Sequence, residues 1–140
     1  DLFESILLHS ILGICCVLKE EYDFALKNFF IAATIAEKSS LESLLWKSYL
    51  NIAQLYYLLS TNKDTYKNSA VFYALESKHI IEQGIFQNPQ LKSNMESIFE
   101  LPKSIANSII NCKNFNPTEK ARKECALHVF YKGCYFFLLD

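Results

Sequence analysis

The five cysteines are the residues in this sequence best suited to redox or metal chemistry. They form no Cys-x-x-Cys pair, the spacing typical of zinc and redox sites, and their odd number would leave one thiol over in a disulfide framework. Several have apolar neighbours, as expected for unreactive thiols in a helical core. We therefore predict reduced core thiols and an intracellular location, cytoplasmic or nuclear. The cysteines are Cys15, Cys16, Cys112, Cys125 and Cys134.

Histidines, carboxylates and glycines give little support for catalysis. His9, His79 and His128 fall in different predicted helices, and none stands in a nucleophile motif with a serine or cysteine. Three glycines spread over the chain cannot form a phosphate-binding loop. The acidic run around Glu20 begins a predicted helix, where negative charge favours the helix dipole. We predict a protein that is not an enzyme and that needs no cofactor or metal.

Composition favours a single all-α domain. Hydrophobic residues make up 51% of the 140 residues, and Gly and Pro number only three each. This is too apolar for disorder and too poor in turn formers for a many-stranded sandwich. The net charge is −1, and the densest basic run, KARK at 120–123, is flanked by glutamates. We expect no nucleic-acid contact. No uncharged run is long enough to predict a membrane span.

Apolar periodicity and cap signals predict seven helices. The first four are expected over 2–18, 21–38, 41–60 and 65–83, with Gly84 as the C-terminal cap of the fourth. Proline at 89, 102 and 117 is typical of a first helical position. It predicts further helices over 89–100, 102–113 and 117–139. Short connections predict antiparallel helical hairpins.

One glycine among large apolar residues identifies the helix contact of the first hairpin. In ILGICCVLKEEYDFALKNFFIAA, residues 11–33, we expect Gly13 to face Ala25 and Ala32, with Phe29 filling the space beside them. This spacing of small and aromatic residues resembles the tetratricopeptide repeat. The resemblance implies hairpins stacked as a right-handed superhelix.

Two further segments resemble the repeat less closely. Around YLNIAQLYYLLSTNKDTYKNSAVFYALESK, Ala53 takes the glycine position and Tyr56 the aromatic position, while LHVFYKGCYFFLLD offers Gly133 and Phe136. The small residues at 13, 53 and 133 are separated by multiples of 40, which exceeds the usual repeat of about 34 residues. Residues 85–113 match no repeat, and an unrelated bundle of helical hairpins is the alternative. We interpret 1–140 as one repeat domain from a longer protein.

The resemblance implies a protein- or peptide-binding scaffold within a multiprotein assembly. In such arrays the first helix of each hairpin lines a concave face. The alternative is the peptide-sensing domain of a bacterial transcription regulator whose DNA-binding module lies outside this chain. The sequence leaves the partner and the oligomeric state open. The partner-binding residues that we predict on the concave face are Asn51, Gln54, Tyr57, Phe130 and Phe137.

Overall fold

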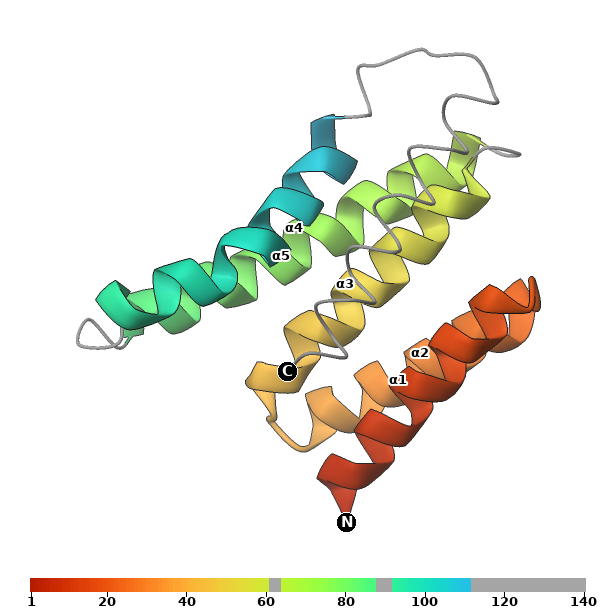
Figure 1. Ribbon diagram of the computed structural model, residues 1–140, viewed down its shortest axis with the longest axis horizontal. Coiled ribbons are helices and arrows are strands. Elements are labelled where there is room, and N and C mark those ends of the chain that lie inside the picture. The colour runs from red at the N-terminus through yellow and green to blue at the C-terminus, as the bar shows by residue number, and fades with distance from the viewer. Residues whose placement is uncertain (61–63, 88–91, 112–140) are drawn as a thin grey trace.

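A computed structural model describes residues 1–60, 64–87 and 92–111 of this chain (Figure 1). Within those ranges the structure is helical and contains no strand, so the all-α prediction is confirmed there. The predicted helix over 117–139 lies outside the described residues. The five helices are α1 (Leu2–Leu18), α2 (Tyr22–Lys38), α3 (Glu42–Leu59), α4 (Asp64–Gln87) and α5 (Lys92–Asn111).

Helices that follow one another in the chain pack side by side. α1 packs on α2 and α3 packs on α4, with α2 also against α3 and α5 against α4. Figure 1 shows these helices as two elongated pairs, with α5 lying along α4. The central helix α3 therefore has neighbours on several sides. Its side chains dominate the main core, where Phe29, Ile52 and Leu55 are completely buried.

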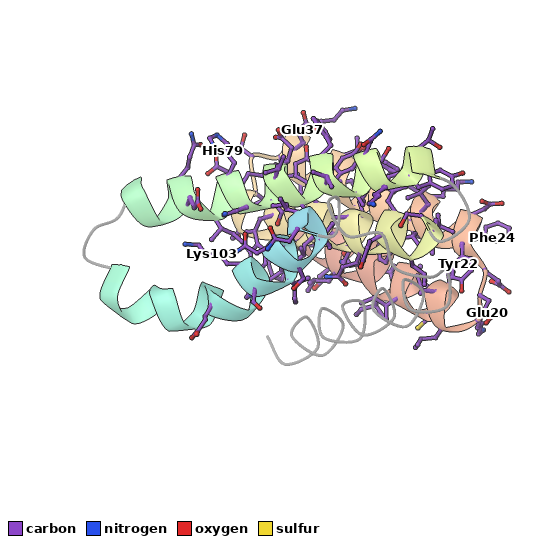
Figure 2. The ribbon with its side chains drawn as sticks, turned by 90° about the horizontal axis from the view of Figure 1, so that it is seen from above. Glu20, Tyr22, Phe24, Glu37, His79 and Lys103 are labelled. Atoms are coloured by element: carbon purple, nitrogen blue, oxygen red, sulfur yellow. The ribbon has the colours of Figure 1, made fainter. Side chains whose placement is uncertain are left out.

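Two turns of nearly identical geometry separate the first three helices. Glu20 and Ser40 occupy the middle of these turns, with φ of 60° and 55°, the left-handed region that non-glycine residues seldom adopt. In the first turn the backbone N–H of Glu21 donates to the carbonyl of Cys16 at 2.8 Å. In the second, Leu41 donates to Ala36 at 2.9 Å. Figure 2 shows Glu20 at the end of the molecule where α1 turns into α2.

The predicted end of the fourth helix is wrong. Gly84 does not cap α4, because the helix continues through it to Gln87 and no glycine of the described residues has a positive φ. Glycine permits the left-handed conformation without requiring it. A β-carbon at Gly84 would have no atom within 4 Å. The position is therefore an open site in the last turn of α4.

The predicted helices over 89–100 and 102–113 are also wrong as two elements, because α5 is continuous and contains Pro102. A proline inside a helix loses a hydrogen bond and crowds the preceding turn, at a cost of about 3 kcal/mol. Pro102 is fully buried, and Ile105, Ala106 and Ile109 on the same helix join the main core. Burial of this apolar face offsets the cost.

Candidate functional site

The candidate site lies on α3, the most enclosed helix of the described structure. Because α2, α4 and α5 all contact α3, most of its circumference is buried. Three of the residues that sequence analysis assigned to a concave face lie on α3, namely Asn51, Gln54 and Tyr57, and all three are buried.

Asn51 and Gln54 stand three residues apart, so their carboxamides project from the same side of the helix. Asn51 is 3% exposed and Gln54 is 0% exposed. Asn51 Nδ2, Gln54 Nε2 and Gln54 Oε1 are buried without a hydrogen-bond partner. Most buried polar atoms in proteins are hydrogen-bonded, and each buried group without a partner costs about 1–3 kcal/mol. The two amides are therefore polar groups with unused hydrogen-bonding capacity inside an apolar environment.

Tyr57 lies one turn beyond Gln54 on α3 and is 3% exposed. The structure thus brings Asn51, Gln54 and Tyr57 together on adjacent turns of one helix. It places them inside the fold and not on an open surface. Phe130 and Phe137 lie outside the described residues. Partner binding by these five residues stays a prediction.

Lys47 lies one turn before Asn51 on α3. Its Nζ is 5.6 Å from the centroid of the Trp46 ring, within the range of a cation–π interaction. Burial lowers the pKa of the Lys47 ammonium group. The carbonyl of Trp46 accepts a hydrogen bond of 2.8 Å from Ser77 Oγ, which joins α3 to α4 in the core. The Ser77–Trp46 hydrogen bond therefore ties the first half of α3 to α4.

A second group of side chains, which we call the tyrosine cluster, was not predicted from the sequence. The rings of Tyr56 and Tyr73 stack with centroids 5.9 Å apart, and Tyr66 stacks on Tyr56 at 5.6 Å. Seven residues separate Tyr49 from Tyr56, and Tyr66 from Tyr73. That spacing places each pair on one side of its helix. It is the feature of the sequence from which the cluster could have been predicted. The cluster consists of Phe30, Tyr49, Tyr56, Tyr66 and Tyr73.

Burial raises the pKa of three phenols in this cluster. For Tyr49, burial is the main cause of the raised pKa, and the negative charges of Glu37 and Glu76 add to it. For Tyr56, burial acts together with the neighbouring Tyr73 and Tyr66. Burial alone raises the pKa of Tyr73. All three hydroxyls therefore stay protonated at neutral pH and can donate hydrogen bonds.

The residues with potential for catalysis are dispersed. His9 Nδ1 donates to Asn28 Oδ1 at 2.9 Å across α1 and α2, while His79 is exposed on α4. Figure 2 shows His79 on the outer side of the molecule. Among the described residues no group of three His, Cys, Asp or Glu side chains could hold a metal ion.

The cysteine prediction needs one correction. Cys16 is half-buried against the main core, but Cys15 is exposed. Cys15 is therefore not a core thiol: it falls on the side of α1 that no described helix covers. Cys112, Cys125 and Cys134 lie outside the described residues.

In the described ranges, no helix combines the length and the apolar character needed to cross a membrane. No protein-family model, curated protein or solved structure matches this chain.

Proposed function

We propose that this chain is a protein- or peptide-binding scaffold, built from tetratricopeptide-like hairpins, in which α3 supplies the recognition residues. One observation carries the proposal: the amide nitrogen of Asn51 and both amide atoms of Gln54 are buried without a hydrogen-bond partner. A carboxamide offers both a donor and an acceptor, the combination that pairs with the N–H and C=O of an extended peptide. Two amides on adjacent turns can hold successive peptide groups of one ligand strand.

The cost of these two amides supports a binding role. A leucine or methionine at either position would fill similar volume without leaving polar atoms unpaired. The neighbours of the two amides on α3, Ile52 and Leu55, belong to the apolar main core. Because Gln54 is completely buried, ligand binding must be coupled to a local opening of the fold. We therefore expect association to be slower than diffusion-limited encounter.

Substitution at Gln54 tests the proposal, because stability and binding should change in opposite directions. We expect Gln54→Met to raise the free energy of unfolding by about 1 kcal/mol, since it removes the unpaired polar atoms. The same variant should lose binding of peptides selected on the unaltered chain from a displayed library of random sequences. Asn51→Leu should likewise be more stable and should lose binding of the selected peptides. Ser48→Ala, which removes a buried hydroxyl bonded to the Leu44 carbonyl within the same helix, should bind as the unaltered chain does.

Two results would contradict the proposal. One is retention of the selected peptides by both Gln54→Met and Asn51→Leu. The other is a loss of stability in those variants as large as the cost of an ordinary buried hydrogen bond, which would reveal a structural role for the amides.

Salt dependence provides an independent check. The chain has a net charge of −1, and Asn51, Gln54 and Tyr57 carry no charge at neutral pH. Peptide affinity should therefore change little between low and moderate salt. A steep decrease with salt would indicate a ligand held mainly by charge and a different surface.

A further inference from the structure

The outer side of α1 carries an exposed apolar stripe. Leu8 is 56% exposed, Leu12 42% and Leu18 58%. At 100° per residue the members of the stripe fall within about one third of the helix circumference. The opposite side of α1 is buried against α2. We call this surface the α1 stripe, and it consists of Leu8, Ile11, Leu12, Cys15 and Leu18.

The equivalent surface of α3 is covered. A shift of 40 residues superposes Gly13 on Ala53 and the start of α1 on the start of α3. Under this shift every buried position of α1 matches a buried position of α3. The α1 stripe matches five α3 residues that are also buried, namely Ser48, Asn51, Ile52, Leu55 and Leu58.

The difference between the two helices lies in their neighbours. α3 contacts α2, α4 and α5, whereas α1 contacts α2 and, slightly, α3. The α1 stripe is thus a helix-packing surface with no helix packed on it in the described structure. Contiguous exposed apolar surface of this kind marks an interaction site.

The arrangement of the α1 stripe makes it complementary to itself. Positions 8, 11, 15 and 18 are symmetric about position 13. An antiparallel pair of α1 helices related by a two-fold axis would therefore place Leu8 opposite Leu18 of the second copy, and Ile11 opposite Cys15 of the second copy. Between Glu4 and Lys19 the helix holds no charged residue. Such a pairing therefore brings no like charges together along the stripe.

We propose that two copies of this chain associate through their α1 stripes as an antiparallel, two-fold symmetric helix pair. The α1 stripe of one copy thus binds the α1 stripe of the second copy. Because one helix face is smaller than the roughly 800 Å² per partner of a standard stable interface, the dimer should have micromolar affinity.

Sedimentation equilibrium of the full 140-residue chain tests the proposal. Between about 1 and about 200 μM, a range that brackets micromolar affinity, the chain should change from monomer to dimer. Leu12→Glu buries a charge in the proposed interface and should stay monomeric over this range. Phe72→Glu alters a side chain on α4 that is 56% exposed and should dimerise as the unaltered chain does. Circular dichroism should show that both variants keep their helical content.

Disulfide crosslinking tests the register and does not depend on the glutamate variant being folded. Ile11→Cys introduces a thiol opposite the native Cys15 of the second copy, so mild oxidation should give a covalent dimer joined between positions 11 and 15. Peptide mass spectrometry identifies the bond, and adding Cys15→Ser should abolish it. The proposal is wrong if the unaltered chain stays monomeric throughout, if Leu12→Glu dimerises normally, or if oxidation never joins these two positions.

Discussion

The ring of Phe29 on α2 rests directly against Gly13 on α1. A β-carbon placed on Gly13 would lie 2.9 Å from Phe29 Cζ, and nearer still to Cδ1 and Cε1. Phe29 is completely buried, as are Ala25 and Ala32 on the same helix. The glycine therefore sets how closely the first two helices approach. We expected the Phe29 ring to lie beside the contact between Gly13 and the alanines of α2. Instead, the ring itself contacts Gly13.

Gly13→Ala should destabilise the fold by up to about 2 kcal/mol. Overpacking costs about 1–3 kcal/mol, and the better helix propensity of alanine returns only about 1 kcal/mol. Gly13→Leu should cost more, because its larger side chain meets the same ring. Urea unfolding of each variant measures the change. In a Phe29→Leu background the cost of Gly13→Ala should shrink, and additive effects would show that the two residues do not interact.

Gly84→Ala should have the opposite sign and serves as a matched control. Gly84 is also inside a helix, but a β-carbon there would contact nothing within 4 Å. Only the conformational preference of alanine remains, so we expect a stabilisation of about 0.5–1 kcal/mol. The same urea titration applies. A loss of stability would mean that α4 does not continue through residue 84 in solution.

Ser77→Ala should lower the free energy of unfolding by about 0.5–1.5 kcal/mol, the usual net value of one hydrogen bond. The Ser77 hydroxyl is buried and donates across the α3–α4 contact to the Trp46 carbonyl at 2.8 Å. Ser108→Ala is the control, because its hydroxyl bonds only to the Ser104 carbonyl within α5. Equal effects of the two substitutions would argue that the link between α3 and α4 contributes nothing.

Stability should fall as the pH rises above about 10, the ordinary pKa of tyrosine. The pKa values of Tyr49, Tyr56 and Tyr73 are raised in the folded protein. Below the unfolded pKa all three are neutral in both states, and their contribution is complete. Above it the unfolded chain loses these protons first, so unfolding becomes more favourable. Burial lowers the pKa of Lys47, which acts in the opposite direction but involves a single group.

Thermal melting between about pH 8 and about pH 11, spanning the ordinary tyrosine pKa, measures this dependence. Tyr73→Phe removes one of the three phenols and should make the decrease in melting temperature shallower. A melting temperature that stays constant or rises above pH 10 would contradict the assigned environment of the cluster.

The first three helices could be predicted from sequence almost to the residue, because strong apolar periodicity is interrupted by short polar turns. The errors at Gly84 and Pro102 share one cause. Glycine and proline change local preferences by about 1 to 3 kcal/mol, and burial of neighbours such as Ile105 and Ile109 outweighs this. The positions of glycine and proline in the sequence therefore could not show that α5 is continuous.

The surroundings of the candidate site residues could not be predicted in the same way. Leu12 and Ile52 occupy equivalent positions in their helices, yet Leu12 is 42% exposed and Ile52 is 0% exposed. Both are apolar, so residue type does not distinguish them. Whether a helix face is covered depends on which other helices pack there. For the same reason the sequence placed Asn51 and Gln54 on the correct helix and gave no sign of their burial.

The short turns at Glu20 and Ser40 also bear on how the chain acquires its structure. In the described residues the extensive helix contacts join consecutive helices, so few contacts require distant parts of the chain to meet. Proteins with such local contacts fold rapidly, because little loop-closure entropy is lost before favourable contacts form. The Gly13–Phe29 contact needs only the first two helices, so we expect this hairpin to begin to form during synthesis, while later helices are still within the ribosome.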